Sequence, residues 1–243
     1  MYITNDIKYI GVNDRRIDLF EGQYIVPNGM AYNSYVIIDE KIAIMDTVDT
    51  NFTHEWMDNI QNAIGSRKPD YLIIQHMEPD HSANIMNLVK AYPDVTVVAS
   101  EKAFKMMKNF FGTDFAEKRM VIAEGSTLCL GKHNLTFIGA PMVHWPETMV
   151  TWVEEEGTLF SGDAFGTFGA IDDEVVDSED TFEQYCDEMM RYYSNIVGKY
   201  GSPVQSALKK LSGLDIKRIC STHGPVWEKN IAQVVALYDK MSR

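Results

Sequence analysis

The sequence predicts a mixed fold of the α/β or α+β class, in which β-sheets are covered by helices. Short β-prone runs alternate with helical stretches along the 243 residues. No internal repeat, low-complexity stretch or Pro/Ser-rich linker divides the chain. The composition, 45% hydrophobic and 23% charged, is that of an ordinary globular protein. We therefore expect residues 1–243 to form a single domain.

The first half is expected to begin with strands and to continue with alternating helices and strands. Turn signals separate five β-prone runs before residue 50: "IKYIGV", "IDLFE", "QYIV", "NSYVIID" and "KIAIMDT". A helix is predicted over 54–65, where Trp56, Met57, Ile60 and Ile64 recur at helical spacing. An apolar run (71–74), a helix at about 82–91, a second run (95–100) and a helix at about 101–110 follow.

The second half returns to short strands and closes with helices. Residues 120–163 hold the runs "VIAE", "STLCL", "LTFIGA", "TMVTWV" and "TLFSG". Helices are predicted over 181–199, 203–212 and 227–241, with "IKRICST" as a strand. The acidic run "DDEVVDSED" (172–180) is expected to be a solvated loop, with a partner-docking edge as the alternative.

The charge and the cysteines exclude several classes of function. A formal net charge of −13 argues against binding of nucleic acid or an anionic membrane, which both require basic patches. No apolar run approaches the roughly 20 residues of a membrane span, and the N-terminus lacks a secretory signal. Cys129, Cys186 and Cys220 are few and far apart, so we expect a reduced, cytoplasmic protein with its cysteines in the core.

Four strand-like runs end in side chains of the types that bind metals. "QHMEPDHSAN" (75–84) alone holds His76, Glu78, Asp80 and His81. His144, Asp163 and His223 follow three later strand-like runs, where a rigid scaffold commonly presents functional side chains. His54 and His133 do not lie at such places and are expected on the surface.

Seven candidate ligands exceed the four of a single zinc ion and suit two metals that share a carboxylate. In an extended segment, His76 and Glu78 point to the same side and can reach one ion, while Asp80 and His81 can serve another. Three carboxylates and a bridging hydroxide would neutralise two divalent ions. Mixed imidazole and carboxylate ligation favours non-haem iron, but zinc or manganese also fits.

The motif H-x-E-x-D-H at residues 76–81 resembles that of the flavodiiron proteins, a branch of the metallo-β-lactamase fold. Zinc hydrolases of that fold usually have H-x-H-x-D-H, so the glutamate at 78 is typical of the iron-binding branch. Further blocks resemble the family in the expected order: "AYNSYVIID", "IMDTV" (44–48), "PMVHWPETM" (141–149), "SGDAFG" (161–166) and "THGPVW" (222–227).

The resemblance implies an αββα sandwich with two iron ions at one end of the packed sheets. One iron would be held by His76, Glu78 and His144, and the other by Asp80, His81 and His223. Asp163 would bridge them, together with an oxo, hydroxo or peroxo species. Family members usually continue into a flavodoxin-like domain carrying FMN, and we expect neither that domain nor FMN in this chain.

Two classes of function follow from the resemblance. The first, which we prefer, is a protein that binds dioxygen at the iron pair and acts as an oxygen or iron sensor with a signalling partner, for example in chemotaxis. The resemblance to stand-alone diiron proteins suggests this function. The alternative is an enzyme that reduces dioxygen to water, or nitric oxide to nitrous oxide, with electrons from a separate donor protein. A hydrolase is a third, which Glu78 disfavours. The family also implies a homodimer.

Four aromatic residues near the candidate ligands could line an oxygen pocket: Tyr32, Trp145, Phe165 and Phe168. Core packing is the preferred interpretation for each of them.

Overall fold

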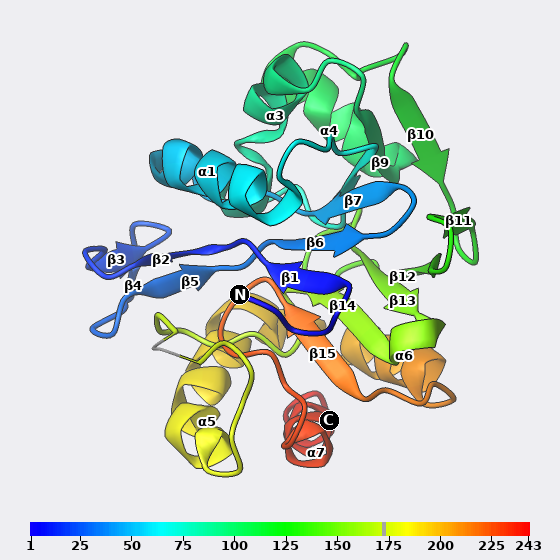
Figure 1. Cartoon of the computed structure of the whole chain (residues 1–243). Coiled ribbons are helices and arrows are strands. Elements are labelled where there is room, and N and C mark those ends of the chain that lie inside the picture. The colour runs from blue at the N-terminus through cyan, green and yellow to red at the C-terminus, as the bar shows by residue number, and fades with distance from the viewer. Residues whose placement is uncertain (172–173) are drawn as a thin grey trace.

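Two β-sheets lie face to face at the centre of the computed structural model, which describes residues 1–171 and 174–243 (Figure 1). The six-stranded sheet has the order β1-β6-β7-β8-β9-β10, and the five-stranded sheet β11-β12-β13-β14-β15. The first comprises β1 (Ile7–Tyr9), β6 (Tyr35–Ile38), β7 (Ile42–Met45), β8 (Tyr71–Ile74), β9 (Thr96–Ser100) and β10 (Arg119–Ile122). The second comprises β11 (Thr127–Cys129), β12 (Asn134–Gly139), β13 (Met149–Val153), β14 (Thr158–Gly162) and β15 (Arg218–Ser221).

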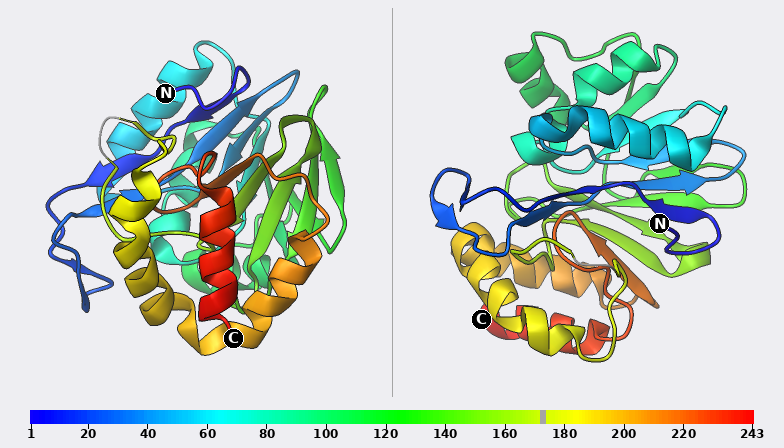
Figure 2. Two further views of the ribbon diagram at one scale, coloured as in Figure 1. Left: turned by 90° about the horizontal axis from the view of Figure 1, so that it is seen from below. Right: turned by 60° about the vertical axis from the view of Figure 1, so that its left-hand side comes forward.

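Helices cover the outer face of each sheet, so the layers run helix, sheet, sheet, helix (Figures 1 and 2). One layer holds α1 (Thr53–Ile64), α2 (Pro79–Ser82), α3 (Ile85–Ala91) and α4 (Glu101–Phe111). The other holds α5 (Thr181–Tyr192), α6 (Gly201–Leu211) and α7 (Ile231–Met241). Two small ribbons, β2 (Val12–Asp14) with β5 (Met30–Tyr32) and β3 (Leu19–Phe20) with β4 (Tyr24–Ile25), complete the strands described. The predicted αββα sandwich is confirmed.

The apolar pattern of each element explains this layering. The four residues of β8 are all buried, because a helix layer covers one face of the strand and the second sheet covers the other. In α1 the stripe Trp56, Ile60 and Ile64 faces the sheet. Burial of each large apolar side chain stabilises the fold by about 1.5–3 kcal/mol.

The direction of the strands sets the place of the functional end. Strands β7 to β10 are parallel, as are β14 and β15. The carboxyl ends of β8, β14 and β15 therefore open toward the segments that hold His76, Asp163 and His223.

Two predicted helix boundaries are wrong. The helix expected over 82–91 is divided into α2 and α3, because the Asn84 amide donates to the carbonyls of Val48 and Asp49 where the helical path breaks. The last helix begins at Ile231 and not at 227. Before it, the backbone N–H groups of residues 228–230 donate to the buried Asp177 carboxylate.

Two expectations about single residues also fail. His133 is fully buried and not on the surface, whereas His54 is exposed as expected. Of the cysteines, Cys220 is buried, but Cys129 lies on the edge strand β11 and is exposed.

The acidic run from 172 to 180 is only partly a solvated loop. Residues 172 and 173 lie outside the described residues. Asp177 is buried, where it accepts the hydrogen bonds described above. Glu174, Glu179 and Asp180 are exposed.

Within the part of the chain that the structure describes, no helix has both the length and the apolar character needed to cross a membrane.

Asp177→Ala is expected to lower the free energy of unfolding by about 2–4 kcal/mol, because it leaves buried N–H donors at the start of α7 without an acceptor. Urea denaturation measures the change. Glu179→Ala, at an exposed position two residues away, is the control and should change the value by less than about 0.5 kcal/mol. Equal stability of the two variants would contradict the role given to Asp177.

Candidate metal centre

The structure brings all seven candidate ligands of the sequence analysis together at one end of the two sheets. Each lies in a segment that follows or joins strands: after β8, between β12 and β13, after β14 or after β15. All seven are buried, with at most 8% of any residue exposed. They are His76, Glu78, Asp80, His81, His144, Asp163 and His223.

The first group joins His76, Glu78 and His144. The Nε2 atom of His144 lies 3.0 Å from Glu78 Oε2 and 3.3 Å from the Nε2 atom of His76. His76 Nε2 lies 3.4 Å from the same Glu78 oxygen. Atoms bound about 2.1 Å from one metal are roughly 3–3.4 Å apart, so this spacing is that of a metal-binding group.

The second group joins Asp80, His81 and His223. The Nε2 atoms of His81 and His223 are 3.1 Å apart, and each lies 3.3 Å from Asp80 Oδ2. Neither oxygen of Asp80 accepts a hydrogen bond from the residues described, although both are buried. A buried carboxylate without a donor is costly unless a cation compensates its charge.

Asp163 lies between the two groups. Its Oδ2 atom is 3.0 Å from His144 Nε2 and 3.3 Å from His76 Nε2, while its Oδ1 atom is 3.0 Å from His81 Nε2. The Thr222 hydroxyl donates to Oδ1 over 2.5 Å. One carboxylate therefore faces both groups with different oxygens, as a bridging ligand would.

Neighbouring carboxylates raise the pKa values of two of the imidazoles, so these rings hold protons when no metal is bound. Burial lowers the pKa of His81, but the charges of Asp80 and Asp163 outweigh it and raise that pKa to about 9. For His144, hydrogen bonds to Asp163 and Glu78 likewise outweigh burial, and its pKa is also about 9. Burial would raise the pKa of Asp163, but the charges of His81 and His76 hold it well below its usual range. A metal must displace these protons to bind.

Acceptors outside the seven residues fix the orientation of two rings. His76 Nδ1 donates to Glu147 Oε1 over 2.7 Å, and the Met77 backbone N–H donates to the same oxygen. His223 Nδ1 donates over 2.7 Å to the Ala31 carbonyl, which can only accept. In a neutral ring Nε2 is then left with a lone pair aimed into the site.

Sequence reasoning missed Glu147 and Glu21. Glu147 stands in the quoted block "PMVHWPETM", three residues after His144, and this proximity was the available signal. Glu21, in the turn between β3 and β4, carried no signal. Glu21 lies at the mouth of the site beside Glu78, and burial and a hydrogen bond to Glu78 raise its pKa to about 8.

A cavity of about 260 Å³ reaches the first group from outside. Glu78 and His144 line it, together with Glu21, Tyr24, Trp145 and Lys199. Trp145, for which core packing was the preferred interpretation, lines this cavity, with its ring 5.1 Å from that of His76. Tyr32, Phe165 and Phe168 are buried in the core, as preferred. A small molecule can therefore approach the first group through this opening.

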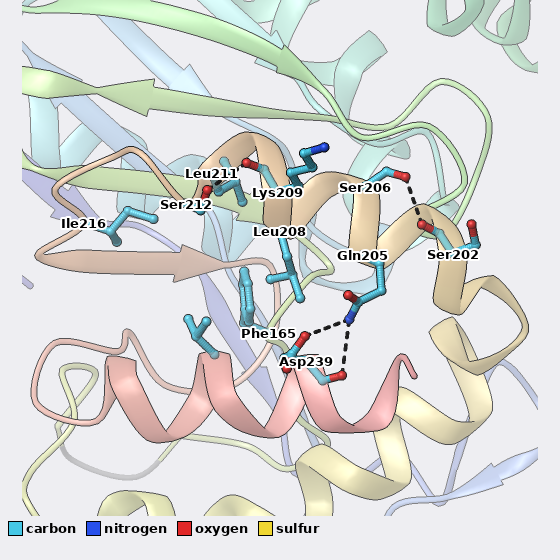
Figure 3. A pocket seen from close by; sticks show the side chains of 11 residues that line it. Phe165, Ser202, Gln205, Ser206, Leu208, Lys209, Leu211, Ser212, Ile216 and Asp239 are labelled. Carbon is cyan, nitrogen blue, oxygen red and sulfur yellow. Dashed lines mark hydrogen bonds between the residues drawn. The ribbon is translucent and has the colours of Figure 1, made fainter.

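A second cavity, of about 630 Å³, lies between α6 and α7 (Figure 3). Its lining includes Phe165 and Leu208, and Gln205 crosses it to donate to Asp239. None of the seven candidate ligands lines this cavity, so it is separate from the candidate metal centre.

Comparison with known proteins identifies the family. Residues 30–224 match the family model described as "ODP family beta lactamase". A nitric oxide reductase of Moorella thermoacetica is 33% identical over 240 residues, which cover 97% of this chain and 59% of that protein.

Solved structures agree with this assignment. The flavodiiron protein of Giardia intestinalis superposes with a TM-score of 0.93 at 29% identity, over 99% of this chain and 58% of that one. The rubredoxin oxygen:oxidoreductase of Desulfovibrio gigas superposes with a TM-score of 0.91 at 31% identity, over 100% and 61%.

The chain spans about three fifths of the length of these relatives. It belongs to the ODP beta-lactamase family, has the metallo-β-lactamase fold, and corresponds to the diiron domain of the flavodiiron proteins.

Proposed function

We propose that this chain holds two iron ions and reduces nitric oxide or dioxygen at them with electrons from another redox centre. One ion would be bound by His76, Glu78 and His144, the other by Asp80, His81 and His223, with Asp163 bridging. The relatives named above support reduction, which the sequence analysis offered as its alternative, over the oxygen sensor that it placed first.

The observation that carries the proposal is the convergence of imidazole nitrogens and carboxylate oxygens in a buried site. In both His76 and His223, Nδ1 donates a hydrogen bond to a neighbouring acceptor. The Nε2 atom of each ring therefore faces the site, where its neighbours are the carboxylates of Asp163 and Asp80. Two divalent ions would replace the protons on these rings, and Glu78, Asp80 and Asp163 with one hydroxide would make the centre neutral. The residues present therefore fit a pair of hard, redox-active metals.

Bound iron would supply the electrons and an open position for a diatomic gas. The overall reactions are 2 NO + 2 e⁻ + 2 H⁺ → N₂O + H₂O and O₂ + 4 e⁻ + 4 H⁺ → 2 H₂O. The chain's own residues orient the ligands and exclude water from the second group. Phe20, Tyr32 and Tyr192 surround the His223 ring, with ring centroids 5.4–6.0 Å away.

The rim of the 260 Å³ cavity is the proposed docking surface for the electron donor. The β3–β4 ribbon beside it exposes Leu19 and Ile25, and Met190 is exposed on α5. The Arg191 guanidinium and the Tyr24 hydroxyl connect this ribbon to the α5 region. Exposed apolar side chains next to an opening are typical of a transient protein contact. The homodimer, a signalling partner and the cytoplasmic location stay predictions.

Turnover is the direct test of the proposed function. Iron-loaded protein, prepared without oxygen, is mixed with excess reductant, a rubredoxin-type donor and nitric oxide or dioxygen. We expect sustained consumption of many equivalents of at least one gas, with one N₂O formed for every two NO. Uptake of a single equivalent without further consumption would instead support the sensor.

Glu78→His tests why this site would use iron. The substitution replaces an anionic oxygen with a neutral nitrogen, so we expect zinc to be preferred and gas reduction to fall by at least about 100-fold. Metal analysis and the turnover assay measure both effects. Glu55→His, at an exposed position on α1, is the matched control and should leave both unchanged. Undiminished gas reduction in Glu78→His would contradict this account of Glu78.

The raised pKa values of His81 and His144 predict opposite effects of pH on the metal-free and metal-bound protein. Their protonated rings stabilise the metal-free fold fully below about pH 6.5, and this contribution is lost as the pH rises to about 9. The Tm of chelator-treated protein should fall by roughly 5 °C or more over this interval, while metal affinity rises. A Tm that does not change between pH 6.5 and 9 would show that the rings are neutral throughout.

A further inference from the structure

A second cluster of ligand-type side chains lies at the opposite end of the sandwich. Asp6 precedes β1, His133 is in the turn between β11 and β12, and Glu156 ends the short helix before β14. The strands β7 and β14 begin at this end, whereas the carboxyl ends of β8 and β14 lead to the candidate metal centre. Each of the three offers one atom within 4.8 Å of the others'.

His133 is held like a metal ligand. It is fully buried, and its Nδ1 atom lies 2.7 Å from Asp39 Oδ2, which also accepts the His133 backbone N–H over 2.8 Å. The carboxylate therefore fixes the ring by accepting a hydrogen bond from Nδ1–H, which leaves Nε2 as the nitrogen free to bind a metal. A carboxylate in this position is the usual partner of a histidine that binds a metal through its other nitrogen.

The free nitrogen of His133 faces two more carboxylates. Nε2 lies 3.2 Å from Glu156 Oε1 and 3.6 Å from Asp6 Oδ2. Ligand atoms of a tetrahedral zinc ion, bound at about 2.1 Å, are ~3.4 Å apart, which lies between these two distances. Within each group of candidate iron ligands the spacing is 3.0–3.4 Å, so the Glu156 distance falls within that range and the Asp6 distance is slightly longer.

The net negative charge of the cluster also favours a divalent cation. Asp6, Asp39 and Glu156 are carboxylates, and one ammonium, that of Lys132, lies 2.5 Å from Asp6 Oδ2. With a neutral imidazole two negative charges stay uncompensated. A proton on Nε2 would remove one of them, and a divalent ion would remove both.

We propose that His133 Nε2, Asp6 and Glu156 form a site for a zinc-type divalent cation, with Asp39 orienting the ring and water completing the coordination. The ion would connect the two sheets, because Asp6 leads into the six-stranded sheet and the other two ligands belong to turns of the five-stranded one. Its role is structural, and it stabilises the folded state by mass action. This site is independent of the iron pair and of the proposed reduction.

Metal analysis of the whole chain tests the site. Iron-loaded protein is equilibrated anaerobically with zinc, freed of unbound ion, and its iron and zinc are measured together. We expect three metal ions per chain in the wild type and two in Glu156→Gln or Asp6→Asn. Glu155→Gln is the matched control, since Glu155 bonds to Asn134, and it should keep three.

A substitution that should strengthen metal binding distinguishes a metal site from a cluster that is neutralised by a protonated histidine. Lys132→Gln removes the ammonium that competes for Asp6, so zinc should bind roughly two- to fivefold more tightly and raise the Tm further than in the wild type. The proposal is overturned if the wild type and Glu156→Gln bind equal numbers of metal ions. It is equally overturned if zinc affinity at the third site is the same in Lys132→Gln, Asp6→Asn and the wild type.

Discussion

Compensation of buried carboxylate charge, by protons or by metal ions, is the constraint on which the functional end of this protein depends. Four imidazole Nε2 atoms and three carboxylates converge within hydrogen-bond distances of one another, and Asp163 lies between both groups. The cost of burying such groups without compensating charge amounts to several kcal/mol. Either protons or metal ions must provide that charge, and the two Asp80 oxygens accept no hydrogen bond from the residues described, which favours metal ions.

The sandwich is built in a way that imposes this convergence. Ligands come from the ends of strands in both sheets, so neither sheet alone could assemble the centre. The rings are then fixed from outside, His76 by Glu147 and His223 by the Ala31 carbonyl of β5. Because these acceptors belong to packed strands and their connections, the geometry is preorganised before any metal binds. The same arrangement, a carboxylate behind a buried histidine, recurs at the far end with Asp39 and His133.

Much of this organisation could be predicted from the sequence, because its signals are local. The density of ligand types in "QHMEPDHSAN" and the strand-like runs before His144, Asp163 and His223 indicated where the seven residues would meet. The parts that were missed depend on contacts distant in sequence. Glu147 reaches His76 across 71 residues, and the start of α7 is determined by Asp177, about 50 residues earlier. His133 was predicted on the surface because Asp39, the carboxylate that accepts the hydrogen bond of its Nδ1 atom, comes from the other sheet.

In the proposed centre, two metal ions share Asp163 as a bridge. Anomalous diffraction from crystals of iron-loaded protein, recorded on both sides of the iron edge, tests it most directly. The account predicts two iron peaks, one among His76, Glu78 and His144 and one among Asp80, His81 and His223, with an oxygen of Asp163 bound to each. A single peak, or two peaks with Asp163 turned away from either of them, would contradict it.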